Sequence, residues 1–213
     1  MDEDDFTSQK GKEIKVILLG DTGVGKTSII NRYINNKFDP DNDSTLSSSF
    51  STKEVIKNDV LYRLNLWDTI GQEKYNAITN ILIKGSNIVI LVYSVDSLSS
   101  FENIDFWYNN IKDILQEDKY ILAIVGNKSD LINEDESIVS EEEARNFAKG
   151  KNAYFKLISA KEDQDGINSL LDILLEELLR LNYVTVTESY VIKRSKYKDT
   201  EKGKKKKKKK KKC

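Results

Sequence analysis

The 213-residue sequence contains no histidine and a single cysteine, which stands at the last position. The absence of histidine excludes zinc clusters, histidine-based triads and imidazole general bases. One cysteine cannot form a disulfide within the chain, so the fold must hold without such a crosslink. Any catalysis therefore depends on carboxylates, amides, lysines, hydroxyls or a bound ion.

Long hydrophobic runs are missing as well. The longest apolar stretches, such as residues 88–93, are too short to cross a bilayer. The start of the chain, MDEDDF, is acidic where a signal peptide would be basic. We therefore expect a soluble, cytoplasmic protein unless something attaches it to a membrane. The length suits one domain of ordinary size with a tail.

The formal net charge of −1 hides an uneven distribution. Residues 193–213 hold 14 Lys and Arg against 2 Asp and Glu, a net charge of +12, which leaves −13 for residues 1–192. The basic segment contains a run of lysines that begins at Lys204 and ends at Lys212. An acidic body with a basic tail predicts an anionic partner for the tail alone. From Lys193 onward the composition predicts disorder.

Short apolar runs alternate with helical patterns along the middle of the chain. The predicted strands are residues 14–19, 60–67, 88–95, 120–125 and 153–158. The predicted helices are residues 26–35, 99–115, 140–149 and 166–181. Residues 55–57 predict one arm of a hairpin with the strand 60–67, because Asn58 and Asp59 lie between them. The pattern indicates an α/β fold with about six strands, mostly parallel with one antiparallel edge strand, and helices on both faces.

A glycine-rich loop is predicted between the first strand and the first helix, where residues 20–27 read GDTGVGKT. The pattern G-x-x-x-x-G-K-[ST] in that position predicts a phosphate loop, in which backbone N–H groups surround phosphate oxygens at a helix N-terminus. Lys26 can reach the β and γ phosphates, and the Thr27 hydroxyl can ligate Mg²⁺. An ordinary glycine-rich turn with an exposed lysine is the competing interpretation. The predicted phosphate-binding residues of this loop are Asp21, Thr22, Gly23, Val24, Gly25, Lys26, Thr27 and Ser28.

The base decides among nucleotide-binding functions, because an ATPase or a small-molecule kinase would use the same phosphate loop. Asn127, Lys128 and Asp130 follow the predicted strand 120–125, where open parallel sheets place ligand loops. A carboxylate at Asp130 can accept from N1–H and the 2-amino group of guanine, a pair of donors that adenine lacks. The segment Ser159-Ala160-Lys161 follows the next strand and could place a backbone N–H against guanine O6. Together these loops predict guanine rather than adenine.

With GDTGVGKTS, STLSSSF, WDTIGQEKY, NKSD and SAK in this order and spacing, the chain resembles the Ras superfamily of small GTPases, and most of all the Rab family. The segment STLSSSF most resembles the early-endosomal branch. The resemblance implies a P-loop NTPase fold, the G domain. It divides the chain into a flexible leader at 1–12, a GTP-binding domain at 13–181 and a flexible, hypervariable tail at 182–213.

The resemblance also implies roles for residues outside the phosphate loop. Phe38 would stack on the guanine, and Thr45 would complete the Mg²⁺ shell when the γ phosphate is present. Asp68 would hold Mg²⁺ through water. The Gly71 N–H would contact the γ phosphate and Gln72 would orient the attacking water, so that both act in catalysis beside the lysine of the loop. Taken singly, such residues could equally be ordinary surface or strand-end groups.

These roles imply a switch between GTP and GDP forms. Segments 36–49 and 70–80 would be held through the terminal phosphate and released when it leaves. We expect slow hydrolysis, because no arginine is obvious in these segments, and a GTPase-activating protein that supplies one could accelerate it by about 10³ to 10⁵. The exchange factor, the activating protein and the effectors would bind through residues 36–50 and 67–82. We expect the protein itself to be a monomer.

Two features depart from the family pattern. Ile70 stands where the pattern WDTAGQ has a small alanine, and crowding there could displace Gln72. A nucleotide-binding module with impaired or no GTP turnover is therefore an open alternative. Phe50 and Trp67 match two members of an aromatic cluster through which effectors recognise Rab proteins, while Leu82 takes the place of the usual tyrosine. Packing within the sheet would also explain the two aromatic residues.

The lysine run and Cys213 could form a nucleic-acid-binding arm, a nuclear address or a membrane tether. The resemblance favours the tether, because Rab tails end in cysteines that receive geranylgeranyl groups, although two cysteines are usual. One lipid chain together with a polybasic patch holds a protein on a membrane, and each lysine near an anionic leaflet contributes about 1 kcal/mol. We therefore expect lipidation of Cys213 and cycling between the cytoplasm and the cytoplasmic face of intracellular membranes, endosomes among them. No nucleic-acid partner is expected.

Overall fold

The computed structural model describes residues 8–40, 49–69, 76–116, 119–134, 139–183 and 188–192. A single sheet runs through these residues in the order β2-β3-β1-β4-β5-β6, and β7 pairs with β1 beside this path. The strands are β1 (Ser8–Leu19), β2 (Ser49–Lys57), β3 (Val60–Asp68), β4 (Ile88–Ser94), β5 (Ile121–Asn127), β6 (Tyr154–Leu157) and β7 (Glu188–Ile192). Strands β3, β1, β4, β5 and β6 are parallel, and β2 is antiparallel to β3 at the edge. The predicted α/β class with a mostly parallel sheet is confirmed.

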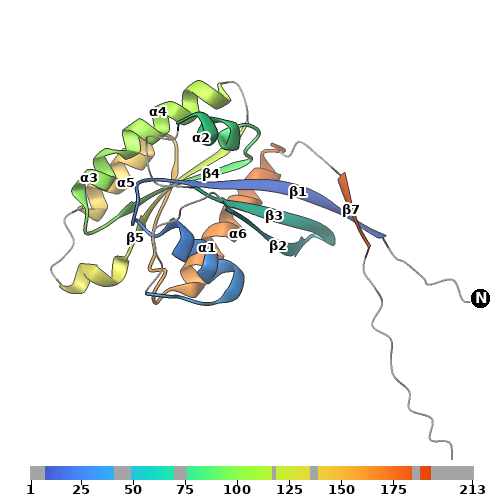
Figure 1. The fold of residues 1–213 in the computed structure, drawn as a ribbon, viewed down its shortest axis with the longest axis horizontal. Coiled ribbons are helices and arrows are strands. Elements are labelled where there is room, and N and C mark those ends of the chain that lie inside the picture. Colours follow the sequence, from blue (N-terminus) through green and yellow to red (C-terminus); the bar gives the residue numbers. More distant parts are fainter. Residues whose placement is uncertain are drawn as a thin grey trace, which may run out of the picture.

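Helices cover both faces of the sheet (Figure 1). They are α1 (Lys26–Asn35), α2 (Asn76–Ile83), α3 (Leu98–Glu102), α4 (Ile104–Leu115), the 3-10 helix η2 (Ser129–Glu134), α5 (Glu141–Gly150) and α6 (Gln164–Arg180). Helices α1 and α6 lie on one face, and α2 to α5 lie on the other. Strands β4 and β5 are buried along their whole length, which explains their unbroken apolar sequences. Among the residues that the structure describes, none of the helices combines the length and apolar character that crossing a membrane requires.

The two faces form two separate hydrophobic cores. Six apolar residues of α6, from Ile167 to Leu178, are at most 3% exposed and pack on the α1 face. Trp107 and Ile111 of α4 pack on the opposite face with Tyr93 of β4. Side chains of the parallel strands alternate between these cores. Because β3, β1, β4, β5 and β6 are parallel, their carboxyl ends lie at one end of the domain. That end carries the predicted ligand loops.

Several elements differ from the sequence-based expectation. The predicted helix 99–115 is two helices that meet at Asn103, and α3 begins where the Ser97 side chain accepts a hydrogen bond from the Ser100 N–H. Helix α2 was not predicted. Strand β2 is longer than the predicted hairpin arm, because it pairs with β3 over its full length from Ser49 to Lys57.

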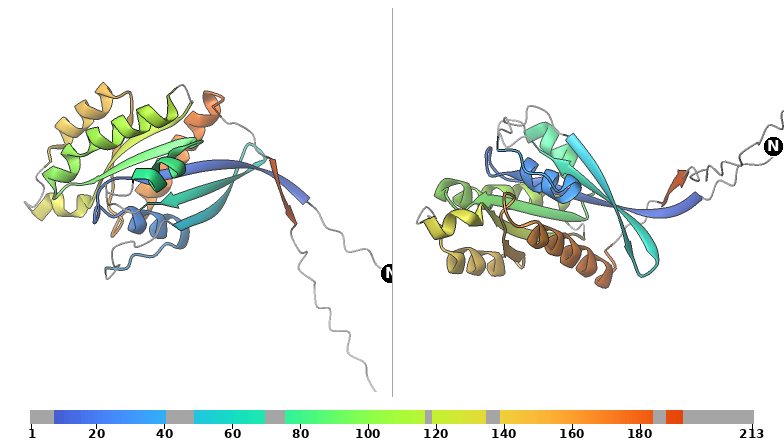
Figure 2. Two further views of the ribbon diagram at one scale, coloured as in Figure 1. Left: turned by 45° about the horizontal axis from the view of Figure 1, so that its top comes forward. Right: turned by 90° about the horizontal axis from the view of Figure 1, so that it is seen from below.

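The largest difference lies at the start of β1, which begins at Ser8 rather than in the region of residue 14. Residues 8–12 pair antiparallel with β7, from Ser8 opposite Ile192 to Lys12 opposite Glu188. This pairing is possible because β4 occupies only residues 16–19 of the same edge of β1. Residues 8–12 and 188–192 were assigned to a flexible leader and tail, and the structure instead places them in the sheet (Figure 2). The domain bounds 13–181 remain a prediction.

Candidate functional site

The loop between β1 and α1 has a backbone that two glycines make possible. Gly20 has φ of +144°, and a Cβ at this position would lie 2.1 Å from the Val92 carbonyl oxygen of β4. Gly25 has φ of +94°, and its Cβ would lie 2.2 Å from Nδ2 of Asn127. Larger residues are therefore excluded by both conformation and space. The loop rests directly on β4 and on the end of β5.

Lys26 is 5% exposed at the start of α1. Its ammonium donates to the backbone oxygens of Gly20, at 2.7 Å, and Asp21, at 2.8 Å. Burial lowers the pKa of Lys26 to about 8, although the carboxylates of Asp68 and Asp21 act in the opposite direction. The loop thus holds a desolvated cation, for which a phosphate would be a strong counter-ion. Thr22, Gly23 and the other predicted members of the loop, through Ser28, adjoin this lysine in the chain.

Thr27 and Asp68 meet beside Lys26. The Thr27 hydroxyl donates to Oδ2 of Asp68 at 2.7 Å, and Asp68 is 3% exposed at the end of β3. Hydroxyl and carboxylate oxygens are the hard donors that Mg²⁺ prefers, so the pair fits the predicted metal site. Within the described ranges there is no group of three or more His, Cys, Asp or Glu suited to a metal ion.

Asn127 connects the phosphate loop with the predicted base loops. This residue is 2% exposed at the end of β5. Its Nδ2 donates to the backbone oxygen of Val24 at 2.8 Å, and its Oδ1 accepts from the Ala160 N–H at 3.0 Å. A single buried amide thus holds the loop after β1 against the loop after β6.

The base loops also contact each other. The Ser159 hydroxyl donates to Oδ1 of Asp130 at 2.6 Å, and the Lys161 ammonium lies 3.6 Å from Oδ2 of the same carboxylate. The Ser129 N–H donates to the Ile158 backbone oxygen at 3.0 Å. The structure therefore brings together the two segments that the sequence proposed for guanine. The Ser159 hydroxyl and the Lys161 ammonium thus orient the Asp130 carboxylate, whose oxygens have further lone pairs that can accept hydrogen bonds.

The other described residues of the predicted base site are Lys128, within the loop after β5, and Phe38. Lys128 has a left-handed backbone with φ of 64°, and its ammonium lies 3.3 Å from Oδ2 of Asp96. Phe38 follows α1 and is partly buried against the core on the α1 face. Their predicted contacts with the base remain predictions, as does the role of every residue proposed for the site.

Several predicted residues lie outside the described part of the chain. They are Thr45, Ile70, Gly71, Gln72 and Cys213. The structure therefore gives no geometry for the γ-phosphate contacts, for the attacking water or for the lipidation site.

Comparison with known proteins assigns the chain to a family. The model of the Ras family matches residues 15–180. The chain belongs to the Ras family. Ras-related protein RABG3b of Arabidopsis thaliana is 39% identical over 168 residues, which are 75% of this chain and 81% of the relative. Ras-related protein Rab7 of Pisum sativum is 39% identical over 166 residues, 76% of this chain and 79% of that protein.

A third relative, the Ypt/Rab-type GTPase ypt7 of Schizosaccharomyces pombe, is 37% identical over 183 residues, 81% of this chain and 87% of the relative. Together the matches identify a Rab-like small GTPase that binds guanine nucleotide and hydrolyses GTP. The predicted P-loop NTPase fold and the predicted Rab resemblance are confirmed. The early-endosomal branch remains a prediction.

The aromatic pair of this Ras-family chain lies at the surface. Phe50 of β2 stacks on Trp67 of β3 with ring centroids 5.3 Å apart, and Phe50 is 55% exposed. Trp67 and Leu82 are partly buried against the core on the α4 face. The two rings are opposite each other across the β2–β3 pair, so packing within the sheet and recognition by effectors both remain interpretations of this pair.

The Ras-family site contains contacts that sequence patterns did not indicate. Arg32 of α1 donates through Nε to the Ala160 backbone oxygen at 2.8 Å. The Thr69 hydroxyl donates to the Leu18 backbone oxygen at 2.7 Å. Each contact joins segments that are far apart in sequence, so hydrophobic periodicity carries no signal for it.

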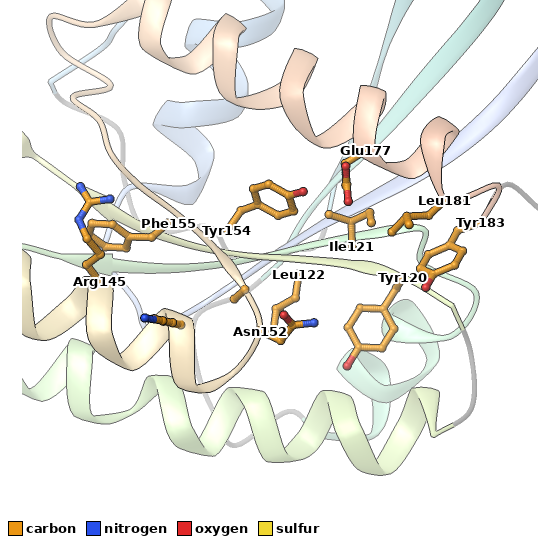
Figure 3. A pocket seen from close by; sticks show the side chains of 12 residues that line it. Tyr120, Ile121, Leu122, Arg145, Asn152, Tyr154, Phe155, Glu177, Leu181 and Tyr183 are labelled. Carbon is orange, nitrogen blue, oxygen red and sulfur yellow. The ribbon is translucent and has the colours of Figure 1, made fainter.

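A cavity of about 490 Å³ lies away from the predicted nucleotide site (Figure 3). Tyr120 and Ile121 at the start of β5, Tyr154 at the start of β6 and Glu177 of α6 are among its lining residues. The lining includes none of the residues predicted to bind nucleotide. Because ligands of parallel sheets bind at the carboxyl ends of the strands, this cavity at their amino ends has no part in the Ras-family site.

Proposed function

We propose that this Rab-like GTPase binds GTP and GDP with Mg²⁺ at the loops joined by Asn127, and acts as a membrane-directed switch in vesicular traffic. The observation that carries the proposal is the Asn127 amide, which contacts the phosphate loop at Val24 and the base loop at Ala160. A nucleotide that spans these two loops would have its base and its phosphates fixed by one rigid unit. Such positioning is the main contribution that a protein makes to phosphoryl transfer.

Within this site, Lys26 would contact the β and γ phosphates, and backbone N–H groups of the loop would surround their oxygens. Thr27, Thr45 and Asp68 would hold Mg²⁺, with Asp68 acting through water. The metal ion would stabilise charge that develops on the transferring phosphoryl group. Gln72 would orient the attacking water and the Gly71 N–H would contact the γ phosphate. Hydrolysis by this chain alone would be slow.

Partners would recognise the nucleotide state through residues 36–50 and 67–82. The exposed stack of Phe50 on Trp67 supports a contact surface there, because large aromatic rings dominate protein interfaces. An exchange factor, a GTPase-activating protein and effectors are the partners that this switch requires.

The membrane would be reached through the tail at residues 182–213, which follows the domain at 13–181. The lysines from Lys204 to Lys212 would bind anionic lipid headgroups, and a prenyl group on Cys213 would insert into the bilayer. The protein would then cycle between the cytoplasm and the cytoplasmic face of intracellular membranes, including endosomal ones.

The proposal is tested by Asp130→Asn, assayed by competition of GTP, ATP and XTP against a fluorescent GDP analogue. The carboxylate accepts two donors of guanine, whereas an amide would present N–H to them. We expect GTP affinity to fall by about 10² to 10⁴, the loss of two hydrogen bonds to a charged acceptor, and XTP to compete better than GTP. Glu142→Gln, an exposed change in the first turn of α5, serves as the control and should leave GTP affinity unchanged. Equal competition by ATP and GTP for the unaltered protein, or an unchanged preference in Asp130→Asn, would contradict the proposal.

A further inference from the structure

The side chain of Asp21 points to a contact that the nucleotide-binding pattern does not explain. Asp21 is the first residue after Gly20 in the phosphate loop, and the pattern there accepts any residue. Its Oδ2 accepts from Nδ2 of Asn103 at 2.7 Å, and its Oδ1 accepts from Nε1 of Trp107 at 3.0 Å. Both oxygens of the Asp21 carboxylate therefore accept hydrogen bonds from the start of α4.

The two donors come from a well-defined part of that segment. Asn103 is the residue at which α3 ends and α4 begins, and Trp107 lies in the first turn of α4. The indole of Trp107 is 2% exposed, because it packs among the apolar residues of the core on this face. A buried indole N–H requires an acceptor, and here a residue of the phosphate loop supplies it.

Asp21 also participates in the internal structure of the loop. Its backbone oxygen accepts from the Lys26 ammonium at 2.8 Å, next to the bond from Lys26 to Gly20. The same residue thus contacts α4 with its side chain and the phosphate-binding lysine with its backbone. Gly20, its neighbour, fits tightly against the Val92 carbonyl of β4. The amino-terminal half of the loop is consequently held from two sides, by β4 and by α4.

A carboxylate at this position has an electrostatic cost. The adjacent site binds polyphosphate under the proposed function, and like charges repel across a short distance. Two N–H donors on the side of α4 offset this cost by neutralising part of the carboxylate charge. If the Asp21 carboxylate made no contact that holds the loop, a neutral side chain at this position would favour phosphate binding more.

We propose that Asp21 is a positioning residue that clamps the phosphate loop to α4 through Trp107 and Asn103, and that this clamp slows nucleotide release. The inference rests on the proposed function, since it concerns the same site. The clamp holds the loop in the conformation that surrounds phosphate. Breaking the clamp lets the loop leave this conformation more easily, and the nucleotide then dissociates faster.

Trp107→Phe tests the clamp in the full-length protein loaded with a fluorescent GDP analogue in the presence of Mg²⁺. The substitution keeps an aromatic ring in the core and removes the N–H donor. We expect dissociation to accelerate by about tenfold, the effect of losing one hydrogen bond to a charged acceptor. Tyr108→Phe is the matched control, because it removes a polar group from the next position of α4, where the ring contacts Lys151 rather than the phosphate loop. Its dissociation rate should equal that of the unaltered protein.

A double-mutant cycle separates the clamp from a loss of packing. Asp21→Ala removes the acceptor, so Trp107→Phe should have no further effect on dissociation in that background. Full acceleration by Trp107→Phe in the Asp21→Ala background would show a packing effect and overturn the clamp, as would an unchanged rate in Trp107→Phe alone. Stoichiometric loading at saturating nucleotide verifies that each variant folds. Failure of the unaltered protein to load guanine nucleotide would instead refute the proposed function.

Discussion

At the scale of single residues, the site depends on one amide that has two different neighbours. Asn127 donates to the phosphate loop and accepts from the loop after β6, and it is almost completely buried. An amide carries a donor and an acceptor in a fixed geometry, whereas an ionised aspartate could only accept and would satisfy part of this arrangement. The residue thus holds two loops of the fold together, and under the proposed function it also shapes the nucleotide site.

Asn127→Ala should affect both properties. The substitution removes two hydrogen bonds and leaves the Val24 oxygen and the Ala160 N–H buried with no partner from this side chain. We expect the free energy of unfolding to fall by about 2 to 3 kcal/mol, measured by urea denaturation at saturating GDP. Asn109→Ala, on the exposed side of α4, is the control and should change stability by less than about 0.5 kcal/mol. Equal effects of the two substitutions would mean that the amide does not join the loops.

At the scale of elements, the β2–β3 hairpin shows how a local turn fixes a register. Asn58 and Asp59 both have left-handed backbones, with φ of 50° and 60°. Two such residues between antiparallel strands form the tight turn whose twist matches that of the hairpin. The register that follows places Phe50 opposite Trp67, so the turn determines which aromatic side chains meet at the far end of the hairpin.

Asp59→Gly should stabilise this hairpin. Glycine adopts the left-handed conformation without the cost of about 1 to 2 kcal/mol that other residues incur, although it loses more entropy on folding. We expect a net gain of roughly 0.5 kcal/mol in the free energy of unfolding, measured by chemical denaturation at saturating GDP. Asp113→Gly, an exposed change within α4, should instead cost about 1 kcal/mol, because the helix requires right-handed backbone. A loss of similar size in both variants would contradict the turn assignment.

At the scale of the whole molecule, charge is divided between body and tail. The body carries −13 and the last 21 residues carry +12, so an anionic membrane attracts one end of the chain and repels the other. This division suits the proposed switch, in which the domain would face partners while the tail would be attached to lipid.

Replacement of the lysines from Lys204 to Lys212 by glutamine should abolish binding of the unlipidated protein to vesicles rich in phosphatidylserine. The attraction is electrostatic, so binding of the unaltered protein should also weaken strongly between 0.05 and about 0.5 M salt. Vesicle sedimentation measures both effects, and neutral phosphatidylcholine vesicles are the control. Equal binding to neutral vesicles, or tighter binding to RNA than to anionic lipid, would argue against a membrane tether.

Mass spectrometry of Cys213 from cells tests the lipid itself, and an unmodified thiol in the membrane fraction would contradict prenylation.

Much of the site could be predicted from the sequence, because its parts are short motifs with local requirements. Glycines at 20 and 25, Lys26 and Thr27 match the pattern of a strand-to-helix turn that would surround phosphate. The alternation of buried strands and amphipathic helices likewise determined the parallel sheet. The local sequence is informative in these elements because the spacing of apolar residues within a short segment indicates whether it forms a strand or a helix.

The tertiary structure alone decided which distant side chains meet. Asp21 reaches Trp107, Asn127 reaches Ala160, and residues 8–12 pair with β7, although nothing in the sequence near any of them indicates its partner. Such contacts depend on how strands and helices are packed, and packing places residues side by side without regard to their separation in sequence. The sequence motifs therefore predicted the family and the ligand, whereas the contacts that hold the loops in place depend on the tertiary fold.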